Sequence, residues 1–229
     1  MDCRLIVALD YANAQDALAL VEQLTPAQCA LKVGLELFTQ AGPLFVRKLV
    51  DKGFKVFLDL KFHDIPNTVA QACKACAELG VWMINVHAAG GLAMMQAARA
   101  AVEPFGSKKP LLIAVTLLTS LSESDLPSLG FQSSLVEQVE RFARLSLDAG
   151  LGGVVCSPLE VPHIKKACGQ SFLTVTPGIR FLQDDKNDQS RVVTPEKAFE
   201  LGSDYVVMGR SITRAASPVR AIELFHHGQ

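Results

Sequence analysis

The chain has 229 residues, 49% of them hydrophobic, and its 22 basic and 23 acidic residues leave a formal net charge of −1. A balance this close to neutrality excludes the broad positive charge with which many proteins bind nucleic acids or anionic membranes. No apolar run reaches the roughly 18 residues of a membrane-spanning helix, and residues 1–10 lack a signal-peptide layout. We therefore expect a cytoplasmic protein with no membrane or nucleic-acid partner.

Short β-rich runs alternate with helical patterns along the chain. Strands are predicted at residues 4–10, 29–33, 55–61, 82–87, 111–116, 153–157, 172–178 and 204–209. The helices that follow them are predicted at 12–24, 37–51, 68–79, 91–102, 134–149, 160–168, 194–201 and 217–225. Alternation of this kind predicts a parallel sheet, and eight β-α units in a chain of this length favour a closed (β/α)8 TIM barrel. We expect residues 1–229 to form one such catalytic domain.

The sequence shows no clear signature of a dinucleotide-binding fold or of a zinc site. No G-x-G-x-x-G follows the first strand, so the main signature of a dinucleotide-binding fold is missing. Cys73 and Cys76 form a C-x-x-C inside a predicted helix, but no second Cys or His pair follows at zinc spacing. We interpret these thiols as reduced and buried for packing, with redox or metal chemistry as the alternative.

A polar residue or a glycine follows each predicted strand, at the edge where a TIM barrel carries its active site. In chain order they are Asp10; Lys32; Asp59, Lys61 and Asp64; Asn85 and His87; Thr116, Thr119 and Ser120; Ser157; Pro177, Gly178 and Arg180; and Gly209, Arg210 and Ser211. A single residue of this kind would be weak support, but a complete ring of them predicts a functional site.

The third predicted strand carries the most unusual charges. Asp59 and Lys61 are two positions apart, so they face the same side of the strand, which can be the lumen of a barrel. Lys32 and Asp10 arrive from neighbouring strands, which predicts a cluster of alternating lysines and aspartates. The alternative is an ion-pair plug that only closes the core of the barrel.

The loops after the seventh and eighth strands read TPGIR and MGRSIT, and these are the two places where TIM barrels often bind phosphate. Gly178 and Gly209 let the backbone approach an anion, and Arg180 and Arg210 can each hold phosphate oxygens with two hydrogen bonds. The alternative is that the glycines only make turns and the arginines are solvated.

The segment between these loops, residues 181–191, is polar and longer than most βα loops. It is interpreted either as a lid that closes on the phosphate, with Gln189 as a contact, or as a plain surface loop.

The charges around Lys61 restrict its chemistry. Neighbouring carboxylates favour the ammonium form, whereas a Schiff-base lysine needs the neutral amine. Lys61 is therefore predicted to donate a proton or to stabilise a carbanion. Asp59 and Asp64 could in principle hold magnesium, but the nearby lysines oppose a cation, so no metal is expected.

These motifs resemble those of one known family. DLKFHDIPNT carries the D-x-K-x-x-D-I-P-N-T signature of orotidine 5'-phosphate decarboxylase, and ALD, KVG, NVH, TLLTS, TPGIR and MGRSIT follow in the family's order across the chain. The resemblance implies a cofactor-free barrel that converts orotidine 5'-monophosphate to uridine 5'-monophosphate (UMP) and carbon dioxide, the last step of de novo pyrimidine nucleotide synthesis.

The resemblance also implies a role for each matching residue. Lys61 would stabilise and protonate the C6 carbanion, and Asp59 would lie beside the substrate carboxylate. Asp10 and Lys32 would bind ribose hydroxyls and extend the charge network. The remaining contacts would be Thr119 and Ser120 at the pyrimidine, Pro177 in the binding site, Arg180, Gln189, Gly209 and Arg210 at the phosphate, and Asp64, Ile65 and Thr68 in the site of the second subunit of a homodimer.

Two alternatives stay open. Magnesium-dependent sugar-phosphate decarboxylases and hexulose-phosphate synthases have a fold that resembles the predicted barrel and share the D-x-K-x-x-D motif. They place an acidic residue where this chain has Lys32. A non-catalytic nucleotide-phosphate binding protein would need the arginines but would have no evident use for Lys61 between two carboxylates.

Overall fold

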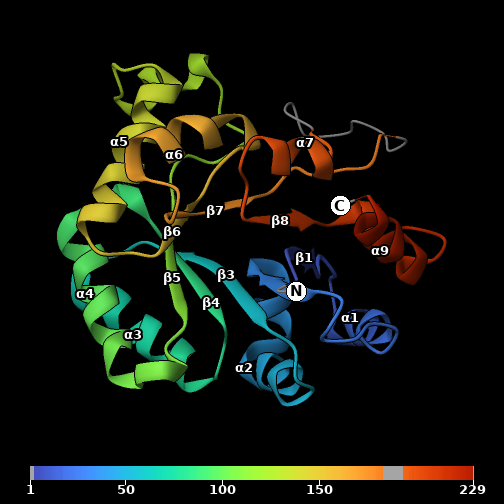
Figure 1. The fold of residues 1–229 in the computed structure, drawn as a ribbon. Helices are drawn as coiled ribbons and strands as arrows, with labels where there is room; N and C mark the ends of the chain where they lie inside the picture. Colours follow the sequence, from blue (N-terminus) through green and yellow to red (C-terminus); the bar gives the residue numbers. More distant parts are fainter. Residues whose placement is uncertain (1–2, 183–192, 229) are drawn as a thin grey trace.

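In the computed structural model, which describes residues 3–182 and 193–228, eight parallel strands close into a barrel in the order β1 to β8. The closing pair joins β1 to β8, with Leu5 beside Val206. Figure 1 shows the helices arranged around the outside of these strands. The predicted single TIM barrel is confirmed.

The strands and helices alternate as predicted. The strands are β1 Leu5–Ala8, β2 Ala30–Gly34, β3 Val56–Phe62, β4 Met83–His87, β5 Leu111–Val115, β6 Gly153–Val155, β7 Leu173–Thr176 and β8 Tyr205–Met208. The helices are α1 Ala14–Val21, α2 Leu35–Asp51, α3 Pro66–Glu78, α4 Leu92–Val102, α5 Leu135–Asp148, α6 Val161–Cys168, α7 Pro195–Glu200, α8 Arg210–Thr213 and α9 Pro218–His227.

Several predicted boundaries are wrong by a few residues, and local capping explains some of them. The first helix begins only after Asn13, whose side chain accepts a hydrogen bond from the backbone N–H of Asp16. The third helix begins earlier than predicted, because Pro66 is well suited to a first helical turn. Helix α8 is not among the predicted helices, since its four residues are too few to show a helical period.

The barrel interior is apolar in its lower layers and polar at the C-terminal ends of the strands. The apolar cluster inside consists of Ile6, Ala8, Ala30, Phe57, Met83, Ile113, Val175 and Val207. Residues two positions further along a strand face the same side. Lys32 follows Ala30, Asp59 follows Phe57 and Asn85 follows Met83 in this way, so they form a polar layer above an apolar floor.

The opposite faces of the strands pack against the helices. Residues such as Val7, Leu31 and Leu58 are fully buried there, in a second and larger apolar cluster. Cys73 and Cys76 belong to this cluster, and burial raises the pKa of each thiol to about 12. A thiol with so high a pKa forms little thiolate at neutral pH, so the structure favours packing over redox chemistry for this pair.

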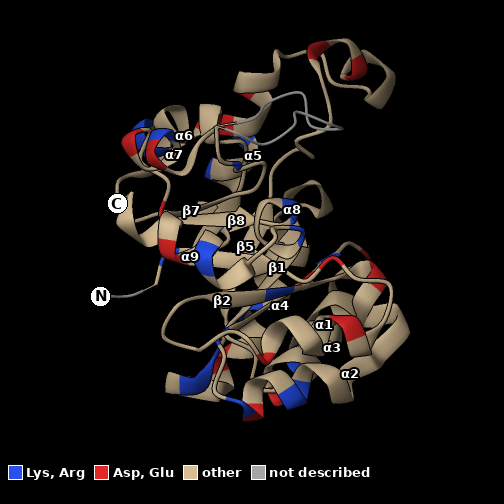
Figure 2. Cartoon of the chain, turned by 90° about the vertical axis from the view of Figure 1, so that its right-hand side faces the viewer, with Lys and Arg blue, Asp and Glu red and all other residues tan. Residues whose placement is uncertain are grey.

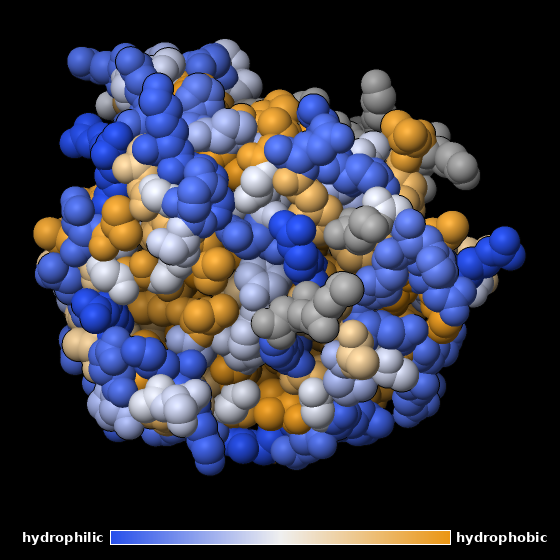
Figure 3. Space-filling view, in the orientation of Figure 1, coloured by the Kyte–Doolittle hydropathy of each residue, from blue (hydrophilic) through white to orange (hydrophobic). Residues whose placement is uncertain are grey.

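The molecular surface matches the balanced composition. Basic and acidic residues are interspersed in the view of Figure 2, and the face in Figure 3 is largely hydrophilic with scattered apolar patches. Within the described residues, no helix combines the length and the apolar character needed to cross a membrane.

A buried ion pair ties α6 to the starts of β7 and β8, at the barrel end opposite the polar layer. Lys165, which is 6% exposed, donates to Asp204 Oδ2 at 2.7 Å and to the carbonyl oxygens of Gln170 and Phe172 at 3.0 and 2.9 Å. Asp204 Oδ2 also accepts from the backbone N–H of Thr174 at 2.7 Å. The pair therefore fixes where β7 and β8 begin.

Replacing Lys165 with methionine should destabilise the fold, because two carbonyl oxygens and the Asp204 carboxylate lose their hydrogen bonds to the ammonium group. We expect a loss of about 2–3 kcal/mol in the free energy of unfolding, below the ~3–5 kcal/mol typical of fully buried pairs because the Asp204 side chain is 28% exposed. Chemical denaturation measures this loss. Lys166→Met, at the exposed neighbouring position, is the control, and equal effects of the two changes would contradict the assignment.

Candidate active site

Lys32 and Asp59 of the polar layer form one wall of a cavity of about 520 Å³ at the C-terminal ends of the strands. This volume lies in the ~300–1,000 Å³ range of small-molecule sites. Its charged side chains come from elements far apart in the sequence, and Phe57, Val155 and Val207 supply apolar lining. Only the barrel topology brings these groups together.

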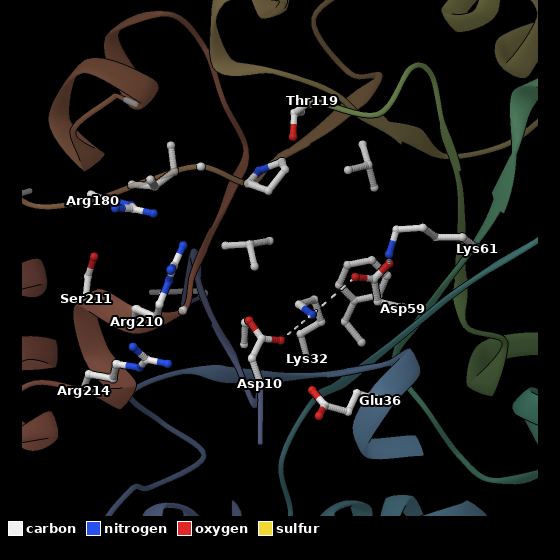
Figure 4. A pocket seen from close by; sticks show the side chains of 18 residues that line it. Asp10, Lys32, Glu36, Asp59, Lys61, Thr119, Arg180, Arg210, Ser211 and Arg214 are labelled. Atoms are coloured by element: carbon white, nitrogen blue, oxygen red, sulfur yellow. Dashed lines mark hydrogen bonds and ion pairs between the residues drawn. The ribbon is translucent and has the colours of Figure 1, made fainter. Parts of the chain in front are cut away.

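Four charged side chains cross the cavity in a row. In Figure 4, Lys61, Asp59, Lys32 and Asp10 follow one another, so that positive and negative groups alternate. Lys61 Nζ lies 2.7 Å from Asp59 Oδ1, and Lys32 Nζ lies 3.4 Å from Asp59 Oδ2 and 3.3 Å from Asp10 Oδ1. We call these four residues the charge row.

The carboxylate of Asp59 is the centre of the charge row. Burial by itself raises its pKa, since the residue is only 8% exposed. The charges of Lys32 and Lys61, with hydrogen bonds from Lys61 and Asn85, outweigh burial and hold the pKa of Asp59 below its usual value. Asp59 is therefore ionised at neutral pH.

Two glycines leave room for the charge row. A Cβ at Gly34 would lie 3.1 Å from Lys32 Nζ, and a Cβ at Gly209 would lie 3.2 Å from Asp10 Oδ2. At both positions, therefore, a side chain would press on a charged group. Gly178 has φ of +81°, a left-handed conformation that favours glycine, and it turns the chain after β7 into the cavity wall.

Three arginines gather at the end of the charge row beyond Asp10. Arg180, Arg210 and Arg214 all line the cavity, and Figure 4 shows them grouped together, with Thr119 across from Asp10 and Lys32. Arg180 is nearly buried, at 7% exposure, whereas Arg214 is exposed. Clustered guanidinium groups of this kind suit a phosphate or another multivalent anion.

Most residues predicted for the site do line this cavity. They are Asp10, Lys32, Asp59, Lys61, Thr119, Pro177, Arg180, Gly209 and Arg210. Ser120 lies beside Thr119 but is exposed and outside the lining. Gln189, and with it most of the predicted lid at 181–191, lies outside the described residues.

Asp64, Ile65 and Thr68 form an exposed group that does not line the cavity of their own chain. Ile65 is 66% exposed, although it is a large apolar residue, and the Asp64 carboxylate accepts a hydrogen bond from the Ile65 N–H at 2.6 Å. The structure thus separates these residues from the charge row, although Asp64 is only three positions from Lys61.

Some lining residues were not predicted as site residues. Arg214 lies four positions after Arg210, which is one helical turn, but the shortness of α8 hid this relation. Glu36 lies four positions after Lys32 and lines the cavity from the start of α2. Ser211 also lines the cavity; it belongs to the predicted ring of residues at the strand ends, although no role was predicted for it.

Two histidines lie beside the charge row at the ends of β3 and β4. The ring centroids of His63 and His87 are 5.5 Å apart. Burial and the neighbouring charges of His63 and Lys61 lower the pKa of His87, and Asp59 opposes this shift. Among the described residues, no three His, Cys, Asp or Glu side chains are grouped so that they could hold a metal ion.

The fold and this arrangement of charge are those of a TIM-barrel enzyme with a small anionic substrate. Comparison with known proteins identifies the family within this class of enzymes. The family model described as "Orotidine 5'-phosphate decarboxylase / HUMPS family" matches residues 3–225. The chain belongs to this family.

Individual relatives agree over nearly the full chain. The orotidine 5'-phosphate decarboxylase of Legionella pneumophila (strain Lens) is 59% identical, and the one of Psychromonas ingrahamii is 54% identical; the alignments cover 97% of this chain and 97% and 95% of those proteins. The crystal structure of orotidine 5'-phosphate decarboxylase from Lactobacillus acidophilus superposes with a TM-score of 0.89 at 40% identity and covers 99% of both chains.

His87 should titrate below the ordinary histidine pKa of 6.5 in the folded protein. The unfolded chain then binds the proton first as the pH falls, so the free energy of unfolding should decrease as the pH falls from about 6.5 to the folded-state pKa. NMR titration of the ring resonances, assigned with His87→Gln, measures the pKa. Denaturation on either side of this window should show a smaller pH effect in His87→Gln, and titration of His87 above 6.5 would contradict the prediction.

Proposed function

We propose that this chain decarboxylates orotidine 5'-monophosphate to UMP and carbon dioxide without a cofactor, as the last step of de novo pyrimidine nucleotide synthesis in the cytoplasm. Membership of the family and the names of the relatives support a carboxy-lyase acting on this nucleotide. One observation supports the residue assignment. The Asp59 carboxylate lies between two ammonium groups above an apolar floor, 3.4 Å from Lys32 Nζ and 2.7 Å from Lys61 Nζ.

The charge row suits a reaction that creates negative charge on carbon. When the bond between C6 and the carboxylate breaks, its electron pair stays on C6 and carbon dioxide leaves. The Lys61 ammonium stabilises this charge and donates a proton to C6, then regains one from water. Asp59 holds the ammonium at 2.7 Å and lies beside the departing carboxylate. Because both groups are already in place, little reorganisation accompanies the charge shift.

The remaining lining residues fit the other parts of the substrate. Asp10 and Lys32 are assigned to ribose hydroxyls, between the charge centre and the arginines. Arg180 and Arg210, with the close backbone approach at Gly209, are assigned to the phosphate. Thr119, with Ser120 beside it, is assigned to the pyrimidine ring, and Pro177 to the cavity wall. Gln189 on the lid remains a proposed phosphate contact.

Lys32 argues against the magnesium-dependent alternative. Its ammonium lies 3.4 Å from Asp59, so a divalent cation on that carboxylate would face a positive charge at close range. A protein that only bound nucleotide phosphates would use the arginines but would gain nothing from the partly buried Lys61–Asp59 contact, which is costly to form without a function.

Replacing Lys61 with alanine should lower kcat for orotidine 5'-monophosphate by at least about 1,000-fold, because the proton donor and the stabilising charge are lost together. Loss of orotate absorbance, followed in EDTA, measures the rate for wild type and variant. Lys52→Ala, at an exposed position before β3, is the control and should keep wild-type activity.

Two outcomes would overturn this assignment. A well-folded wild type that turns over no substrate would remove the proposed reaction. Activity lost in EDTA and restored by magnesium would support the metal-dependent sugar-phosphate chemistry instead.

We also propose that the protein is a homodimer in which Asp64, Ile65 and Thr68 of one subunit complete the site of the other. Their exposure, the large apolar side chain of Ile65 and their absence from their own cavity support this proposal. In a symmetric dimer the same surface of each subunit contacts the other, so residues outside their own cavity can lie at the cavity of the partner.

Mixing two inactive variants tests this arrangement. Lys61→Ala and Asp64→Ala impair different subunits of a shared site, so random exchange should leave about a quarter of the sites intact and restore a similar share of activity. Mixing Lys61→Ala with Asp59→Ala is the control and should restore none, because both residues lie in one cavity. No recovery in the first mixture despite subunit exchange, or a monomer in sedimentation at micromolar concentration, would contradict the proposal.

A further inference from the structure

The backbone of Lys61 has an unusual conformation. Its φ is +53°, which makes it the one non-glycine residue with positive φ among residues 3–182 and 193–228. L-amino acids with a Cβ rarely adopt this region, and such residues cluster at functional sites. Something in the surrounding structure must therefore hold Lys61 in place.

The strand pairing around Lys61 is irregular in the same place. Leu58 pairs with Ile84 and Phe62 pairs with Val86, so four steps along β3 correspond to two steps along β4. Residues 59–61 of β3 therefore stand opposite the single residue Asn85. A bulge of this kind leaves backbone groups without their usual ladder partners.

The side chain of Asn85 fills this gap in the ladder. Its Oδ1 accepts a hydrogen bond from the backbone N–H of Lys61 at 2.8 Å, and its Nδ2 donates to Asp59 Oδ1 at 2.8 Å. Asp59 Oδ1 also accepts from Lys61 Nζ at 2.7 Å, so the three residues close a ring of hydrogen bonds. Asn85 is fully buried, so no water competes for these contacts.

An amide of this length meets both demands. Leucine has a similar shape but would leave the Lys61 N–H without an acceptor. Aspartate would keep an acceptor but, when ionised, would place a second negative charge against Asp59. An asparagine between these two groups therefore determines both the backbone of Lys61 and the orientation of the Asp59 carboxylate.

We propose that Asn85 is a positioning residue for decarboxylation, which acts by holding the left-handed backbone of Lys61 and the carboxylate of Asp59 in one rigid unit. This inference rests on the proposed function for its effect on catalysis. Asn85 does not line the cavity, so its effect on the reaction passes through its two neighbours.

Kinetics separate positioning from a purely structural role. Asn85→Leu should lower kcat by at least about 100-fold, the scale that misplacement of a reacting group can cost. KM should stay within about threefold of wild type, because the arginines at the phosphate end are untouched. The control is Thr174→Val, which removes a fully buried hydroxyl bonded to Asp204 at 3.0 Å at the far end of the barrel; it should lose stability but keep kcat.

Asn85→Asp supplies a second signature. When protonated, the introduced carboxylic acid has one acceptor and one O–H donor and can replace the amide, but when ionised it repels Asp59. Repulsion raises the pKa of such a group. The kcat of Asn85→Asp, relative to wild type at the same pH, should therefore rise as the pH is lowered from about 8 to about 6, a trend that a loss of stability would not produce.

Hydrogen exchange of the Lys61 amide, observed by NMR, reports on the geometry without any substrate. It should be slow in wild type and fast in Asn85→Leu, while the paired amides of β4 stay protected. If the exchange rates of wild type and Asn85→Leu differ in this way but wild type shows no turnover, the proposed function is wrong, whereas the role of Asn85 in holding the Lys61 backbone is supported. If wild type turns over substrate, either of two results would overturn the inference. One is that Asn85→Leu keeps kcat and a protected Lys61 amide; the other is that Asn85→Asp follows the wild-type pH profile.

Discussion

The Asp59 carboxylate lies between the ammonium groups of Lys32 and Lys61, and the rest of the site depends on this contact. Either lysine alone would be costly in the barrel, and together they would repel each other without the carboxylate. The apolar floor beneath them excludes water, which strengthens each charge. The missing side chain at Gly34, the irregular pairing of β3 and the amide of Asn85 each serve to keep these three groups together.

Much of this arrangement follows from the amino-acid sequence. The alternation of strands and helices predicts the barrel, because a parallel sheet of eight such units closes on itself. The two-residue period of a strand places Lys32 above Ala30 and Asp59 above Phe57, in the lumen. Because the C-terminal ends of all the strands lie at one end of the barrel, the arginines of the last two loops are expected in the same cavity. These predictions succeed because each depends on local geometry that repeats.

The features that escaped prediction depend on how two segments meet. Nothing in the apolar pattern of residues 55–61 reveals that β3 bulges, so neither the left-handed Lys61 nor its bond to Asn85 could be foreseen. Arg214 directly follows helix α8, whose four residues are too few to show a helical period. Asp64, Ile65 and Thr68 turn away from the cavity, and only the family resemblance, not their spacing, gave them a separate role.

Under the proposed function, the left-handed backbone of Lys61 sets stability and activity against each other at one position. An L-residue there costs about 1–2 kcal/mol, a penalty that glycine would escape. A chain selected for thermal endurance alone would therefore drift towards glycine at residue 61 and would lose its ammonium. Under the proposed function, a long, charged side chain is retained for chemistry at a position that conformational preference would give to glycine, at the expense of the fold.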